Sequence, residues 1–347
     1  MLNVNKLSIQ FIILTMSLAL LAGIGYGKSS AFDWQLQLQT VYDDNIINYS
    51  DPDLDQFDDP SAQNDKFAIE SKDDFIINPE IELIYKTQLL GHSFHVGLIT
   101  DYYYFSKNDI KRHWRFETYF KRYFKRGSYF QASVVYLPDY YYRNCFISGE
   151  GFFESEFDKI LTNAKFAYRF NKKIQANLEY SFSNKDFIEI FDERDITEHQ
   201  FGGSFIYRPV SLWKGWLSYE YCHAVGAGAD NITYRRDTSY DHNKFTVGSR
   251  FYLKGLTRKS FQIAASASYK FVQYQTTKIS DEDRYRLGRE DKRFYLNFSI
   301  KHYIKRGINA EARYKYYLKN VDIPAKDLED KLESSSNTLY FILNYSL

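Results

Sequence analysis

The feature that most restricts the fold of this chain is a strict alternation of apolar and polar side chains. The stretch 304–318, IKRGINAEARYKYYL, holds two interleaved sets: Ile308, Ala310, Ala312, Tyr314 and Tyr316 against Asn309, Glu311, Arg313 and Lys315. Because successive side chains of a β-strand point to opposite faces, a period of two predicts a strand with one apolar face. That face covers the core of a soluble sheet, or it faces lipid in a membrane barrel.

The same alternation recurs along the whole chain in segments of strand length. We expect strands near 34–38, 77–85, 94–104, 114–116, 130–136, 164–170, 174–182, 201–207, 217–221, 245–251, 261–271, 294–300, 308–316 and 339–347. These fourteen segments give the even number that single-chain bacterial outer-membrane barrels require. The expected range is about 12 to 16 strands.

The connections between these segments are sorted by length. Short connections are expected at 89–92, 125–127, 171–173, 209–214, 254–259 and 305–307, and long ones at 48–71, 142–157, 186–197, 226–238, 276–290 and 319–336, with an intermediate one at 106–112. Membrane barrels have short periplasmic turns and long extracellular loops. A soluble β-sandwich or solenoid, the alternative, gives no reason for this order. The sequence therefore predicts an all-β, antiparallel, up-and-down transmembrane barrel.

The composition agrees with a membrane barrel. Aromatic residues make up 19% of the chain, with 32 Tyr and 29 Phe, and charged residues make up 26%. Tyrosine suits the two membrane–water interfaces, and the charges suit a wet interior. The net charge of +1 gives no reason to expect a nucleic acid as partner.

Residues 1–31 are predicted to be a secretory signal peptide. Lys6 supplies a positive charge, Leu7–Ile24 forms a hydrophobic region, and the small residues Ser29–Ala31 offer a cleavage site. The alternative is a retained membrane anchor. Beyond residue 31 no apolar run approaches the roughly 18 residues that a membrane helix needs. We therefore expect residues 32–347 to form one barrel that crosses the membrane with strands.

The chain has two cysteines, Cys145 and Cys222. The expected topology places them on strands that are not neighbours, which favours two unpaired thiols. A disulfide stays open as the alternative, because an exported chain meets an oxidising compartment.

Two short segments carry a resemblance to known proteins. The last segment alternates up to Leu347 and resembles the C-terminal signal that the barrel assembly machinery reads in bacterial outer-membrane proteins, although that signal usually ends in Phe. Tyr42–Ile46, YDDNI, resembles the start of an outer-membrane β-barrel porin family, some members of which occur with exopolysaccharide export systems. The resemblance implies a barrel in the outer membrane of a Gram-negative bacterium, surrounded by lipid and lipopolysaccharide. It brings no catalytic residues.

Motifs for catalysis and for metal binding are absent from the sequence. There is no HExxH, P-loop, GxSxG or CxxC pattern. Ser239, Asp241 and His242 are close in sequence, but adjacent strand residues face opposite sides, so Asp241 cannot orient His242. The acidic segment 51–59 begins like an EF-hand loop but has Gln56 and Ala62 where that loop needs Gly and Glu. We expect no enzyme activity, no cofactor and no metal.

Basic side chains outnumber acidic ones at the positions that should face the lumen. The pore-lining residues predicted from the alternation are Arg115, Glu117, Lys165, Arg169, Glu179, Arg208, Arg250, Lys270, Arg293, Arg313 and Lys315. A wet interior with excess positive charge concentrates anions. The sequence thus predicts a porin-like channel for small hydrophilic solutes with a mild preference for anions, and the loop 48–71 as its plug or gate.

Two other functions are consistent with the same pattern. A barrel that exports or takes up polysaccharide would use inward tyrosines to stack on sugars; these are Tyr103, Tyr129, Tyr252, Tyr295, Tyr303 and Tyr317. A plugged barrel with a structural or enzymatic role would have lumen charges that neutralise each other. Barrels of 16–18 strands hold aqueous channels and barrels of eight are filled with side chains, so fourteen strands do not decide between them.

Overall fold

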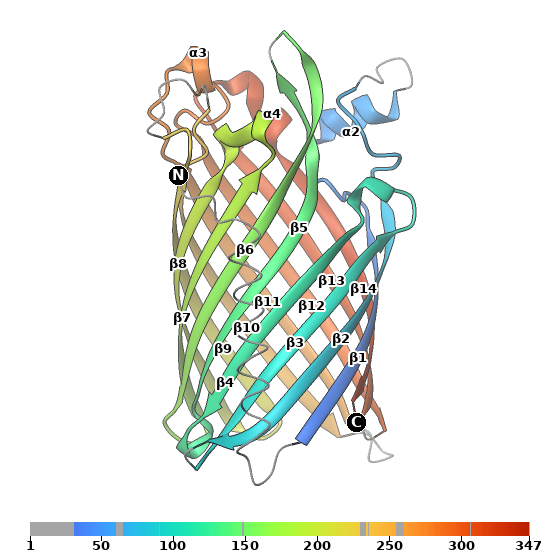
Figure 1. The fold of residues 1–347 in the computed structure, drawn as a ribbon, viewed down its shortest axis with the longest axis vertical. Coiled ribbons are helices and arrows are strands. Elements are labelled where there is room, and N and C mark those ends of the chain that lie inside the picture. Colours follow the sequence, from blue (N-terminus) through green and yellow to red (C-terminus); the bar gives the residue numbers. More distant parts are fainter. Residues whose placement is uncertain are drawn as a thin grey trace.

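The computed structural model describes residues 31–59, 65–89, 91–147, 149–229, 234, 236–254, 260–305 and 307–346. Fourteen antiparallel strands form a closed barrel in which each strand pairs with its neighbours in sequence and β1 pairs with β14. The strands are β1 (Ala31–Asp43), β2 (Asp74–Leu89), β3 (His92–Phe105), β4 (His113–Tyr123), β5 (Tyr129–Ile147), β6 (Gly151–Arg169), β7 (Ile174–Phe187), β8 (Ile196–Val210), β9 (Trp213–Gly226), β10 (Tyr240–Lys254), β11 (Ser260–Tyr274), β12 (Glu290–Lys305), β13 (Ile308–Asp322) and β14 (Ser334–Ser346). The predicted fold and strand number are confirmed (Figure 1).

The period-two alternation places large apolar side chains on the outer surface of the barrel. Leu178 is 67% exposed, Phe341 60% and Leu217 58%. The neighbours of Leu178 are polar, and Asn177 and Glu179 both lie at inward positions. Exposed apolar area on this scale would cost a protein in water a large free energy, about 25 cal/mol for each Å². The outer surface is therefore that of a membrane-spanning barrel.

The connections lie at opposite ends of the barrel according to their length (Figure 1). The short turns join β2 to β3, β4 to β5, β6 to β7, β8 to β9, β10 to β11 and β12 to β13. Most connections at the other end are longer and contain short helices: α2 (Asp51–Asp58), η1 (Asp109–Lys111), η3 (Glu189–Arg194), α3 (Ser280–Asp283), η4 (Lys326–Leu328) and α4 (Glu329–Leu332). η2 (Lys125–Gly127) is part of a short turn. Within the described residues no helix is long and apolar enough to cross a bilayer.

The prediction of a long loop at 142–157 is wrong. Residues 142–147 extend β5 and residues 151–157 extend β6, and together they form a hairpin that projects beyond the rim (Figure 1). The register between the two strands shifts twice, between Leu137 and Tyr140 and between Tyr141 and Arg143. Asp139, with a positive φ of 45°, lies in the first shift. Each extra residue disturbs the alternation of faces, so the period of two is hidden in the sequence.

The first long loop, residues 44–73, contains a helix and a small apolar core of its own. Ser50 caps α2, because its hydroxyl accepts a hydrogen bond from the Asp53 backbone N–H at 3.3 Å. Apolar side chains on both sides of α2 then pack against Tyr141 of β5, which is 2% exposed. The members of this loop core are Ile46, Ile47, Tyr49, Leu54, Phe57, Phe67, Ala68, Ile69, Ile110 and Tyr141.

Both cysteines are buried and unpaired, Cys145 in β5 and Cys222 in β9. This confirms the prediction of two free thiols. The proposed signal peptide lies outside the described residues except for Ala31, which begins β1, and Leu347 lies outside them too. Both the signal peptide and the C-terminal assembly signal stay predictions.

Candidate functional site in the barrel lumen

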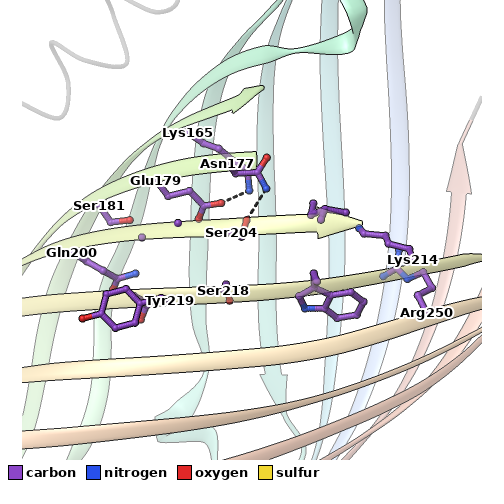
Figure 2. A pocket seen from close by; sticks show the side chains of 15 residues that line it. Lys165, Asn177, Glu179, Ser181, Gln200, Ser204, Lys214, Ser218, Tyr219 and Arg250 are labelled. Carbon is purple, nitrogen blue, oxygen red and sulfur yellow. Dashed lines mark hydrogen bonds and ion pairs between the residues drawn. The ribbon is translucent and has the colours of Figure 1, made fainter. Parts of the chain in front are cut away.

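Two neighbouring polar cavities lie along the inner wall. The first, of about 310 Å³, is lined by residues of β6 to β10, among them Lys165, Glu179, Lys214 and Arg250 (Figure 2). The second, of about 220 Å³, is lined by Arg250 again, with Glu311, Arg313 and Lys315. Five of the predicted pore-lining residues thus border these cavities: Lys165, Glu179, Arg250, Arg313 and Lys315.

The wall formed by β2, β3 and β4 carries an acidic cluster. Arg115 bonds Asp101, with 2.9 Å between Nη1 and Oδ2, and also pairs with Glu117. Glu82 accepts a hydrogen bond from the Tyr119 hydroxyl at 2.7 Å. The single guanidinium is shared by two carboxylates, so this wall keeps an excess of negative charge. Arg115 and Glu117, both predicted to line the pore, are brought together here.

Cations without counter-ions occupy the opposite wall. In the ring of strands, β10 lies seven positions from β3 and so faces it. Arg250 of β10 and Lys214 of β9 are directly opposite each other in the ladder, and both line the first cavity. Among the residues that the structure describes, neither has a carboxylate oxygen within 4.0 Å. Like charges in directly opposed positions destabilise a sheet pair.

The other predicted lumen cations differ in their surroundings. Lys165 is paired with Glu179, Arg313 with Glu311 at 2.8 Å, and Arg293 with Asp291 at 2.6 Å. Arg169 and Arg208 lie near the short turns. The Arg169 guanidinium is 3.1 Å from the point where a Cβ on residue 127, a glycine, would lie, and Arg208 donates a hydrogen bond to Gln175 at 3.5 Å. Lys270 and Arg293 are opposed across β11 and β12. The predicted set is therefore spread along the wall rather than gathered in one ring.

Lys214 and Lys319 are among the lumen cations that lie outside the strands predicted from the sequence. Lys214 was assigned to a turn at 209–214, but β9 begins at Trp213. Lys319 was assigned to a loop at 319–336, but β13 continues to Asp322. The missing signal was strand length, because the apolar alternation ends before the hydrogen-bonded ladder does.

Most of the inward tyrosines proposed to stack on sugars are packed against other side chains. The rings of Tyr295 and Tyr317 have centroids 5.1 Å apart, and Tyr103 is stacked on His113 at 4.6 Å. The Lys121 ammonium lies 4.2 Å from the ring centroid of Tyr129. These contacts fix the rings in place along the wall.

The first loop lies across part of the long-loop end of the lumen. Asn45 donates to the Ser335 carbonyl of β14 at 3.1 Å, and Asn144 of β5 donates to the Asp65 carbonyl at 2.6 Å. Because β14 and β5 are five strands apart in the ring, the loop is fixed to two distant parts of the rim. This is the loop predicted to act as the plug or gate.

A buried lysine connects the next loop to the base of the projecting hairpin. The Lys111 ammonium donates to the Tyr141 carbonyl at 3.0 Å and lies 4.6 Å from the ring centroid of Tyr140. No carboxylate pairs with it in the described part of the chain. Burial, together with the positive charge of Arg143, lowers the pKa of Lys111 to about 7.

The remaining candidate centres do not assemble. The Asp241 carboxylate is 2.8 Å from His223 Nδ1, whereas His242 Nε2 is 3.2 Å from Glu220, so the two neighbours have different partners on opposite faces. The acidic segment that begins like a calcium loop forms α2 instead, and its Asp53 pairs with Lys66 at 2.5 Å. The described residues contain no group of three or more His, Cys, Asp or Glu side chains placed to hold a metal ion.

No protein-family model matches the chain, and no curated protein matches it. Several solved outer-membrane proteins are similar in structure. A loop-L8 deletion mutant of OmpT from Vibrio cholerae shares 9% identity with a TM-score of 0.46, covering 92% of this chain and all of that one. A bacterial polysaccharide outer membrane secretin shares 11% identity with a TM-score of 0.45, covering 90% of this chain and 98% of that one. The outer membrane channel DcaP of Acinetobacter baumannii shares 10% identity with a TM-score of 0.46, covering 92% of this chain and 97% of that one.

Proposed function

We propose that this protein is a channel of the bacterial outer membrane that passes small hydrophilic solutes and mildly prefers anions. The apolar outer surface of the closed barrel supports the membrane location. The observation that carries the anion preference is the pair Lys214 and Arg250, two lumen cations without carboxylate partners in the described structure. Unpaired cations beside a polar cavity lower the free energy of an anion in transit.

The two walls also differ in sign. The cluster around Asp101 is acidic, and the facing wall around Arg250 is basic. A polar solute between them would align its dipole across the lumen, while the excess of unpaired cations favours anions overall. The long first loop narrows one end, which fits a channel that restricts solute size.

The test is the current through planar lipid bilayers that contain the refolded chain, residues 32–347, under a salt gradient. We expect a steady current with an anion-selective reversal potential. The double variant Lys214→Glu/Arg250→Glu should shift the reversal potential toward cation selectivity. Lys172→Glu/Lys173→Glu, which makes the same charge change on an exposed turn, serves as the control and should leave it nearly unchanged.

Two results would contradict this proposal. Protein that shows the heat-modifiable gel mobility of a folded barrel but carries no current would be a plugged barrel. An unchanged reversal potential in the double variant would remove the assigned role of Lys214 and Arg250.

A further inference from the structure

Four cations form a continuous row across four adjacent strands of the lumen wall. Lys244 of β10 is opposite Lys270 of β11, Lys270 is opposite Arg293 of β12, and Arg293 is opposite Lys319 of β13. Lys244 and Lys270 point inward, because their strand neighbours Phe245 and Tyr269 are exposed on the outer face. Arg293 and Lys319 point inward too, because directly opposed residues of neighbouring strands lie on the same face. Adjacent strands are about 4.8 Å apart, so the row extends about 14 Å around the wall.

The charge of this row is only partly balanced. Lys244 is 3.6 Å from Glu220, and Arg293 bonds Asp291 at 2.6 Å. Lys270 and Lys319 have no carboxylate within 4.0 Å in the part of the chain that is described. Three successive like-charged pairs oppose folding, because each places two cations directly across a ladder.

Other inward charges show what a purely structural arrangement looks like. On β6 and β7 the opposed pair is Lys165 and Glu179, which form an ion pair. On β12 and β13 the opposed pair is Lys301 and Glu311, with 4.0 Å between nitrogen and oxygen. The cation row lacks this alternation of sign, so its positive charge is available to a ligand.

A row of hydroxyl groups runs beside the cations, two residues closer to the short turns. Thr246, Ser268, Tyr295 and Tyr317 are consecutive partners on the same four strands. The hydroxyls of Thr246 and Ser268 are 2.8 Å apart, and the rings of Tyr295 and Tyr317 are packed together. A ligand lying along both rows would meet positive charges on one side and hydroxyls and aromatic rings on the other.

The row ends at the mouth of the barrel. Lys319 borders a cavity of about 320 Å³ together with Asp51 and Asp55 of α2, Asp330 of α4 and Glu333. Barrel strands are tilted to the axis, so a row perpendicular to them climbs the wall obliquely toward this mouth. The cations therefore lie along a path between the mouth and the interior rather than in a closed ring.

We propose that these two rows bind a linear acidic oligosaccharide, a chain of sugars that carry carboxylates, in an extended conformation along the wall. The cations would pair with successive carboxylates, and the hydroxyl row would bond the sugar hydroxyls. The inference rests on the proposed channel function and names a substrate class for it. A simple anion needs one cation, whereas the length of the row fits several charges on one chain.

The test combines channel block with direct binding. Tetragalacturonate is added to the open channel in planar bilayers, and its binding to detergent-folded protein is measured by calorimetry. We expect block and binding by tetragalacturonate but little by galacturonate or by maltotetraose, a neutral chain of equal length. The double variant Lys270→Gln/Lys319→Gln should weaken both effects about tenfold or more, because two charge-assisted hydrogen bonds are lost. Lys301→Gln, an inward lysine away from the row, should change them little.

The hydroxyl row is tested separately. Tyr317→Phe should weaken the binding of tetragalacturonate and its block of the channel, but it should leave any block by tripolyphosphate unchanged. Equal block by maltotetraose, stronger block by tripolyphosphate than by tetragalacturonate, or equal effects of the row and control variants would overturn the inference while the channel stands. Row-dependent binding by a folded barrel that carries no current would support the binding rows and overturn the channel.

Discussion

Lys214 and Arg250 are directly opposed across the β9–β10 ladder, and both border the polar cavity of about 310 Å³ in the lumen wall. A sheet gains stability from opposed charges of unlike sign and loses it from charges of like sign. The pair therefore costs the sheet stability, which fits a role in the proposed channel rather than in the fold. An anion that passes between them is the simplest candidate.

Neutralising one member of this pair should stabilise the barrel slightly. For Lys214→Gln we expect the free energy of unfolding in urea to rise by about 0.5 kcal/mol, because a directly opposed like-charge pair is removed. Anion selectivity should fall in the same variant. Lys165→Gln is the matched control, since it breaks the ion pair with Glu179 and should not stabilise. A fall in stability for Lys214→Gln would show that the ammonium has a structural partner.

The acidic wall should respond in the opposite way. Asp101 is 1% exposed and bonds Arg115 at 2.9 Å. Asp101→Asn should destabilise the barrel by about 2 kcal/mol, since the half-buried Arg115 guanidinium loses one of its two carboxylates. It should also strengthen the preference for anions. Urea unfolding and the reversal potential measure the two effects, and a cation-selective shift would contradict the assignment of this wall.

The fold could be predicted from the sequence because the barrel has a single strong signal. Outward residues such as Leu178 and Phe298 alternate with polar neighbours, and this period alone defines strands, faces and strand number. Strand pairing register is not written in any local pattern, so neither the opposition of Lys214 and Arg250 nor the row from Lys244 to Lys319 could be foreseen. The hairpin at 142–157 was missed for a related reason, because the bulges near Asp139 disturb the period.

The loop that contains Lys111 should become more stable as the pH rises above 7. Burial lowers the pKa of Lys111 to about 7, below the ordinary 10.5. Below pH 7 the lysine is protonated in both the closed and the open loop, and the cost of burying the charge is fully present. Between about 7 and 10.5 only the closed loop loses the proton, so its stability increases. Hydrogen exchange of residues 106–112, corrected for intrinsic rates, should slow relative to a β12 peptide, and Lys111→Met should remove the difference.

A carboxyl group beside β8 should give the reverse dependence. Asp195 accepts a hydrogen bond from the Phe187 backbone N–H at 2.7 Å, and burial raises its pKa to about 7 from the ordinary 3.8. Between pH 4 and 7 the folded loop 188–195 keeps a proton that the open loop has lost, so its stability falls as the pH rises through this range. Exchange in this loop should be slower, after correction, at pH 5 than at pH 7.5. Asp195→Asn should abolish the change, and a pH dependence that survives in that variant would assign it to another group.

The first loop should hold its position through Tyr141. This side chain is 2% exposed and joins the loop core formed by Ile47, Tyr49 and Ile69. Tyr141→Ala should leave the barrel folded, because the ring lies above the ladder of β1 to β4, but it should cost the loop about 3 kcal/mol of packing. We expect larger and more variable single-channel conductance, since the loop would then leave its place across the rim. Phe146→Ala, which truncates an exposed ring on the same strand, is the control. If both variants conduct like the unaltered protein, the loop does not limit the current and the narrowest part of the path lies deeper, beside Arg250.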